Sequence, residues 1–112
     1  ITVNNVGVSY KHAEFYGDWD PQACDDMIKV NIHSVLKMTR LVLDGMVSRK
    51  RGLLVHISSG SGYAPFPLYS VYSGTKSFVN NFAESLLYPF TNLCVFSSEV
   101  REQFRRIFTV SI

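Results

Sequence analysis

Cysteine is scarce in this chain, with only Cys24 and Cys94 among 112 residues, and their separation matches no metal-binding spacing. We expect two reduced thiols rather than a disulfide, as in a protein that faces the cytosol. Long apolar runs are also lacking, since no segment reaches the roughly 20 residues that a membrane-spanning helix needs. The first residues have neither the charged start nor the cleavage region of a signal peptide. We therefore expect any membrane association to come from segments outside these residues.

An excess of one charge is absent as well. Eleven Lys and Arg residues against nine Asp and Glu residues give a formal charge of +2, which is too weak for a nucleic-acid surface. We interpret the basic cluster from Arg49 to Arg51 as a solvated helix end rather than a phosphate or lipid site. The 46% apolar content predicts one small globular unit with a core. The chain begins at Ile1, without methionine and inside a β-prone stretch, so we expect the natural start to lie upstream.

Strand and helix signals alternate along the first half of the chain. Residues 1–3 are apolar and β-prone, and they run into the turn-forming stretch Asn4-Asn5-Val6-Gly7. Asp20 followed by Pro21 predicts a helix start, because Asp accepts hydrogen bonds as an N-cap and Pro tolerates the first helical position. Apolar residues at helical spacing continue this helix to about Gly52.

The second half repeats the order of strand and helix. Residues 53–57 are almost continuously apolar, which is typical of a strand buried on both faces in a parallel sheet. A polar glycine-bearing loop follows at 58–62, and a second helix is predicted from about Leu68 to Leu87. The two predicted helices are long connections between successive strands, and only parallel strands require such crossovers. They indicate an α/β protein with part of a doubly wound parallel sheet. The loops at 4–7 and 58–62 would then flank one crevice at the carboxyl ends of the strands.

Four side chains with a chemical use converge on this crevice: Ser59, Tyr72, Lys76 and Asn31. A phenol is a poor acid near neutral pH, but a nearby ammonium stabilises the phenolate and makes the hydroxyl a usable proton donor to a carbonyl under reduction. Ser59 can hold the same carbonyl oxygen, and a buried Asn31 can order a water for proton resupply. The set pairs no nucleophile with a base, so acyl transfer is disfavoured and hydride must come from a cofactor.

Simpler interpretations exist for the neighbouring residues. Tyr72 and Lys76 are four apart and would be neighbours on any helix. His56 lies in the apolar run, where a hydrogen-bonded core histidine is a better interpretation than a metal ligand, and we expect no metal site. Tyr69 is interpreted as packing or pocket wall. The stripe formed by Phe78, Phe82 and Leu86 indicates core or a subunit contact.

The order and spacing of these motifs resemble the short-chain dehydrogenase/reductase family. Asn4-Asn5-Val6-Gly7 matches N-N-A-G with Val for Ala, Ser59 lies thirteen residues before Tyr72, and Tyr72 to Lys76 matches Y-x-x-x-K. Asn31 stands where that family has its helix asparagine. The resemblance implies a Rossmann-type fold in which Tyr72 is the acid, Lys76 supports it, Ser59 orients the carbonyl and Asn31 holds a proton relay. It also implies a nicotinamide cofactor bound by Asn4, Asn5, Val6, Gly7, Tyr72 and Lys76.

Within the family, the stretches NNVGVSY, HISSGSG and PFPLYSVYSGTKSFV resemble the group of 17-beta-hydroxysteroid dehydrogenase type 12 and the very-long-chain 3-oxoacyl-CoA reductases. This similarity implies NADPH-dependent reduction of a 3-ketoacyl-CoA or of a ketosteroid at the endoplasmic reticulum membrane. The loop at 65–68 and the aromatic residues Tyr10, Phe15 and Tyr16 are expected to supply apolar pocket walls. The family often pairs subunits through the second helix, which makes a homodimer an expectation.

Two departures from the family pattern lead to a second hypothesis. The 112 residues contain no T-G-x-x-x-G-x-G turn, and residues 88–112 lack the family's Pro-Gly turn. We therefore divide the chain into a partial catalytic domain at 1–87 and a divergent tail at 88–112, with a short strand at 93–96 and a helix at 99–108. The alternative to a reductase fragment is a non-catalytic remnant that at most dimerises with an intact homologue. On either view we expect the isolated chain neither to bind NADPH tightly nor to fold as a stable monomer.

Overall fold

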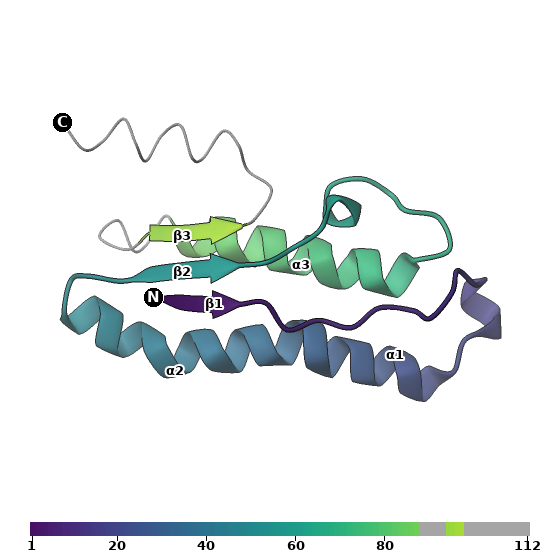
Figure 1. Cartoon of the computed structure of the whole chain (residues 1–112), viewed down its shortest axis with the longest axis horizontal. Coiled ribbons are helices and arrows are strands. Elements are labelled where there is room, and N and C mark those ends of the chain that lie inside the picture. Colours follow the sequence, from purple (N-terminus) through teal and green to yellow (C-terminus); the bar gives the residue numbers. More distant parts are fainter. Residues whose placement is uncertain (88–93, 98–112) are drawn as a thin grey trace.

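A computed structural model describes residues 1–87 and the backbone of residues 94–97. Its sheet has three parallel strands, β1 (Thr2–Asn4), β2 (Leu53–His56) and β3 (Cys94–Ser97), in the order β1-β2-β3 (Figure 1). Helices connect consecutive strands, as parallel pairing requires. This confirms the predicted α/β class and the parallel sheet, and β3 provides the short strand expected at 93–96. The helix expected at 99–108 lies outside the described residues.

The first crossover is one helical rod with an interruption. It begins after a 3₁₀ turn (Tyr16–Asp18) and consists of α1 (Pro21–Ile28), a π-helical turn (Lys29–His33) and α2 (Ser34–Ser48). Asp20 caps α1 as predicted, because its Oδ1 accepts a hydrogen bond of 3.0 Å from the backbone N–H of Gln22. The sequence predicted an unbroken helix, and the π turn was missed. Such turns occur often at functional sites, and this one contains Asn31.

The second crossover begins with a 3₁₀ turn (Gly60–Gly62) and continues as α3 (Ser70–Leu87). Both long helices pack on one face of β2, where Met46 of α2 and Ala83 of α3 contact Leu54. Leu54 is fully buried, whereas its neighbours Leu53 and Val55 remain partly exposed. The expectation of a strand buried on both faces is therefore wrong for the described residues, since α2 and α3 cover the same side.

Helix α2 leaves several apolar side chains in solvent. Leu36, Met38 and Leu41 are 37%, 43% and 76% exposed, although a regular helix would place Met38 on the same row as Met27 and Val35. The π turn explains why Met38 is exposed, because its extra residue rotates the following helix by about 100°.

Phe78 and Phe82 of α3 stack on each other, with ring centroids 5.7 Å apart. The homodimer remains a prediction. In the described residues no helix is long and apolar enough to cross a membrane.

Candidate active site

The loop that follows β1 is anchored by one buried asparagine. Asn4 is 8% exposed, and its Nδ2 lies 3.3 Å from Thr39 Oγ1 and 3.1 Å from His56 Nδ1. The next residues, Asn5, Val6 and Gly7, are exposed. Asn4 therefore holds the end of the strand to α2 and β2, and the following three residues remain accessible to a ligand.

His56 is a hydrogen-bonded core histidine, as the sequence predicted. Its side chain is fully buried, and its ring packs edge-on against Phe82 at 5.8 Å. Because Nδ1 accepts the hydrogen bond from Asn4, the ring proton must sit on Nε2, which has no partner among the described residues. Burial lowers the pKa of His56 from 6.5 to about 4, so the imidazole is neutral at physiological pH.

We expect His56 to make folding stability sensitive to mild acid. Since its pKa is lower in the folded than in the unfolded state, the unfolded chain binds the extra proton between about pH 6.5 and pH 4, and stability falls as pH falls through that window. The free energy of unfolding should drop by about 2 kcal/mol between pH 7 and pH 5. Urea denaturation at the two pH values, on a full-length reductase that carries residues 1–87, measures this, and His56→Asn, which cannot titrate, should lose most of the dependence. An equal acid loss in both proteins would contradict the assignment.

The π turn aims Asn31 at the loop that leaves β1. Asn31 is 2% exposed, and its Oδ1 accepts a hydrogen bond of 2.8 Å from the N–H of Val8. Its Nδ2 donates to the carbonyl of Val8 at 2.9 Å and to Thr75 Oγ1 at 3.0 Å. Both amide hydrogens are thus used by the protein. A water of the expected proton relay would have to use the second lone pair of Oδ1.

Lys76 is a buried cation in the middle of the site. Its side chain is 6% exposed, and Nζ donates to the carbonyl of Ile57 at 3.1 Å. The same Nζ lies 5.7 Å from the centroid of the Tyr72 ring. Burial lowers the pKa of Lys76 below its usual value. A side chain added at Gly7 would come within 3.4 Å of Nζ and 3.5 Å of Asn31 Oδ1, so the accessible loop, the lysine and the asparagine meet at one point.

Tyr72 and Ser59 line one pocket. This reaction pocket, of about 580 Å³, is also bordered by Ser9, Phe66 and Tyr69. Ser59 Oγ accepts hydrogen bonds from the Ser61 hydroxyl at 3.1 Å and the Ser61 N–H at 3.4 Å, which leaves its own O–H to donate to a ligand. Tyr69 is pocket wall, in agreement with its interpretation. The structure thus brings all four predicted catalytic side chains to one end of the sheet.

Several residues that hold the site together were not predicted. Thr75 is 2% exposed and links Asn31 to the Tyr72 carbonyl, to which its hydroxyl donates at 2.7 Å. Ser73 and Ser77 donate to the carbonyls of Ser61 and Gly62, both at 2.6 Å. The two serines are four apart in the sequence, so they share one face of α3, and that spacing was the available signal.

The loop also approaches α3 closely at Gly62. A Cβ there would lie 2.8 Å from the Lys76 carbonyl carbon and 2.9 Å from its oxygen. Only glycine permits the backbone of the loop to contact the helix at this distance. Gly62 and the serine hydroxyls therefore fix the Ser59 loop against the helix that carries Tyr72 and Lys76.

The sequence model of short chain dehydrogenases matches residues 1–92. The chain belongs to the short chain dehydrogenase family. It is 45% identical over 106 residues to the human very-long-chain 3-oxoacyl-CoA reductase, an alignment that covers 93% of this chain and 34% of the relative. It is 47% identical over 89 residues to very-long-chain 3-oxoacyl-CoA reductase-B of Danio rerio, covering 77% of this chain and 28% of that one. The chain spans about a third of the length of these relatives.

Solved structures agree with the family fold. A 3-oxoacyl-[acyl-carrier protein] reductase from Brucella melitensis with bound NAD superposes with a TM-score of 0.78 at 29% identity, covering 85% of this chain and 38% of that one. The closed form of a serine dehydrogenase complexed with NADP+ gives 0.80 at 32% identity, with coverage of 85% and 39%. The described strands and helices therefore form part of the Rossmann-type fold of this dehydrogenase family.

The residues present fit a nicotinamide cofactor. The exposed residues Asn5, Val6 and Gly7 follow the carboxyl end of β1, where ligands bind in such sheets. The space beside Gly7 is bounded by Lys76 Nζ, which has two hydrogens left after its bond to Ile57.

Proposed function

We propose that these residues form the catalytic part of a nicotinamide-dependent reductase that converts the 3-oxo group of a long-chain acyl-CoA, or a steroid ketone, into a secondary alcohol. The observation that carries the proposal is the burial of the Lys76 ammonium beside the Tyr72 ring, next to the pocket that Ser59 also lines. A buried cation is costly unless nearby groups use its charge. A phenol that must release a proton is such a group.

The chemistry divides among the chain's own side chains. Ser59 donates a hydrogen bond to the ketone oxygen and holds it against Tyr72, whose hydroxyl delivers the proton to that oxygen. Lys76 stabilises the phenolate that remains, and Asn31 keeps the loop at Val8 and the π turn in place around it. The bound cofactor would supply hydride to the carbonyl carbon. The Asn4-to-Gly7 loop, Tyr72 and Lys76 would hold it.

Phe66 and Tyr69 give the reaction pocket an aromatic wall, with ring centroids 5.3 Å apart. Such a wall favours an apolar substrate. Phe15 and Tyr16 were expected to contribute as well, but they border neither this pocket nor its neighbour and are 73% and 70% exposed. The names of the relatives favour an acyl-CoA over a steroid.

NADPH as the hydride donor and the endoplasmic reticulum as the site of action belong to the same proposal. They rest on the similarity of the quoted motifs to the 3-oxoacyl-CoA reductase group. Turnover measured with NADPH and with NADH tests the first part, and a preference for NADH would reject that part of the proposal alone.

We expect the substrate class to be apparent in a chimera in which residues 1–87 replace the matching segment of the human reductase, so that a complete cofactor-binding half is present. Its kcat/KM should be at least about tenfold higher for a long-chain 3-oxoacyl-CoA than for a polar keto-sugar, because each buried methylene contributes about 0.8 kcal/mol. Estrone tests the steroid alternative under the same conditions. A preference for the sugar would overturn the proposed substrate class, and a folded chimera without any activity would favour the non-catalytic remnant.

A further inference from the structure

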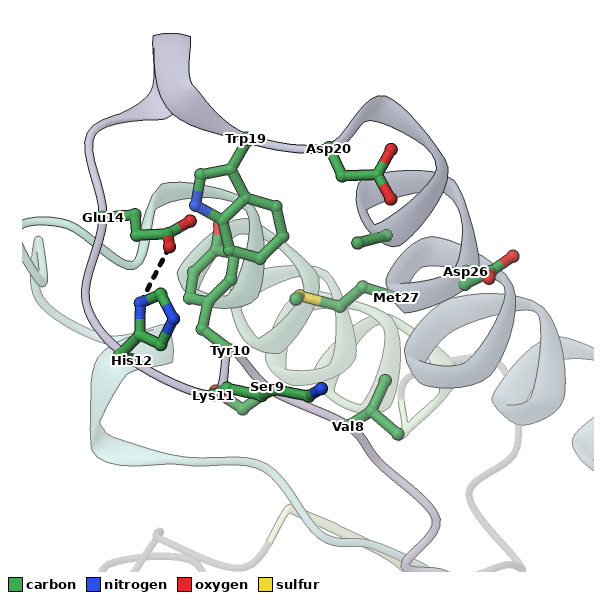
Figure 2. Close-up of a pocket in the computed structure, with 11 residues that line it drawn as sticks. Val8, Ser9, Tyr10, Lys11, His12, Glu14, Trp19, Asp20, Asp26 and Met27 are labelled. Carbon is green, nitrogen blue, oxygen red and sulfur yellow. Dashed lines mark ion pairs between the residues drawn. The ribbon is translucent and has the colours of Figure 1, made fainter.

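A second pocket, of about 380 Å³, lies beside the reaction pocket, and Ser9 borders both. It is enclosed by the loop at 8–14, by Trp19 and by the first turns of α1 (Figure 2). We call it the Trp19 pocket, and the lining residues that matter here are Val8, Tyr10, Glu14, Trp19, Ala23 and Met27. The proposed reaction gives it no role, although a substrate placed at Tyr72 would extend past Ser9 toward it.

The indole of Trp19 presents a hydrogen-bond donor that the described part of the chain does not satisfy. Trp19 Nε1 is buried and has no hydrogen-bond partner there. The adjacent Tyr10 hydroxyl is already engaged as acceptor for the N–H of Val71 at 2.9 Å. A buried donor without a partner is destabilising, and an acceptor oxygen on a ligand would remove that penalty once the side chains that cover Nε1 in this structure shift to admit it. In Figure 2 the indole nitrogen is turned toward the side of the pocket where Glu14 and His12 form an ion pair.

The other groups around the pocket narrow the kind of ligand. Met27 and Val8 provide apolar surface. Glu14, Asp20 and Asp26 place carboxylates at the edge, where Lys11 adds an ammonium and His12 lies against Glu14. A plain alkyl chain would leave the indole N–H unpaired, and a bare phosphate would meet three carboxylates against the ammonium of Lys11. A chain with amide groups suits the pocket better, because each amide offers a carbonyl to Trp19 and an N–H to a carboxylate such as that of Glu14.

Amide-bearing chains occur in the substrates that the relatives' names specify. One relative is a 3-oxoacyl-CoA reductase, and one structural neighbour is a 3-oxoacyl-[acyl-carrier protein] reductase. Coenzyme A and acyl carrier protein both hold their acyl group as a thioester of pantetheine, an arm with two amides. The arm is the part of the substrate that the two reactions share beyond the 3-oxoacyl group itself.

We propose that the Trp19 pocket receives the pantetheine arm of an acyl thioester, with the Trp19 indole N–H donating to an amide carbonyl while the 3-oxo group lies at Tyr72. This inference rests on the proposed function for the position of the 3-oxo group. Trp19 acts in it as a specificity-determining residue that recognises the thioester carrier and takes no part in proton or hydride transfer.

The kinetic test compares two substrates with the same acyl group in the chimera, a 3-oxoacyl-CoA and the ethyl ester of the same 3-oxo acid, which has no amide. Trp19→Phe should raise KM about fivefold for the CoA substrate, the effect of one lost hydrogen bond, and leave KM for the ester and both kcat values unchanged. Ala23→Leu fills the pocket from an exposed helical position and should act the same way. Tyr16→Phe, which removes a hydroxyl outside the pocket, is the control. An equal change for both substrates, or none for either, would overturn the inference.

Direct binding separates this inference from the proposed function. Pantetheine alone is titrated calorimetrically into the chimera, and we expect binding to weaken about fivefold in Trp19→Phe and not in Tyr16→Phe. If the chimera reduces neither substrate but pantetheine binds in a Trp19-dependent way, the proposed function fails and the pocket assignment stands. If the chimera is active but neither pantetheine binding nor KM for the CoA substrate changes in Trp19→Phe, the pocket assignment is wrong.

Discussion

Tyr72→Phe in the chimera should lower kcat by about 10²- to 10⁴-fold while leaving the dissociation constant of NADPH nearly unchanged. The phenol is needed chiefly where the ketone oxygen gains a proton, so its loss removes mainly an interaction of the transition state, and the Asn4-to-Gly7 loop and Lys76 still hold the cofactor. The ring itself remains, and with it the contact 5.7 Å from Lys76 Nζ and the wall of the reaction pocket. Single-turnover reduction and NADPH fluorescence titration measure the two quantities separately.

Tyr69→Phe is the matched control for this variant. Tyr69 borders the same pocket, packs on Phe66 and loses the same atom in the substitution. If Tyr72 is the proton donor, Tyr69→Phe should change kcat by less than about threefold, within the range of an altered pocket wall. If kcat fell by a comparable factor in both variants, the rate would depend on the general polarity of the pocket and not on one proton donor. Full turnover in Tyr72→Phe would reject the assignment.

The positions of the proposed catalytic side chains could be predicted from the sequence because the spacing that determines them is local. Tyr72 and Lys76 are four apart on one helix, and Ser59 directly follows the apolar strand that places it at the edge of the sheet. Asn31 was selected as a polar residue at an apolar helical position, and its 2% exposure confirms that it is buried, while its role in a proton relay stays a prediction. In each case one short segment with a clear hydrophobic pattern determines where the side chain goes.

Features that depend on long-range register could not be predicted. The hydrogen bond between the Asn4 and His56 side chains forms because β1 and β2 pair with these two residues opposite each other. The sequence of neither strand determines that register. The π turn around Asn31 is likewise held by hydrogen bonds to Val8, a residue 23 positions away. Its rotation of α2 then exposed Met38, which a regular helix would have placed on the Met27 row.

Lys76→Met should reduce both turnover and cofactor affinity, in contrast to Tyr72→Phe. Methionine has the same unbranched shape as lysine, which matters because Lys76 is only 6% exposed. The substitution removes the charge that stabilises the phenolate. It also removes the two N–H donors of the ammonium that the bond to Ile57 leaves available for the cofactor. We expect kcat to fall at least about 10²-fold and the dissociation constant of NADPH to rise about tenfold. Lys37→Met, the same change at an exposed position of α2, is the control and should alter neither quantity.

The pH dependence distinguishes a charge effect from a loss of packing. Burial lowers the pKa of Lys76, so turnover that needs the ammonium should be lost at a lower pH than the usual lysine value of about 10.5, as the folded protein gives up that proton. In Lys76→Met this alkaline decline should vanish along with most of the rate. The variant also leaves the Ile57 carbonyl without its donor at a cost of about 1 kcal/mol, so circular dichroism must show that it folds. A folded Lys76→Met protein with unchanged turnover would show that the buried cation is structural, and proton donation by Tyr72 would then need another source of stabilisation.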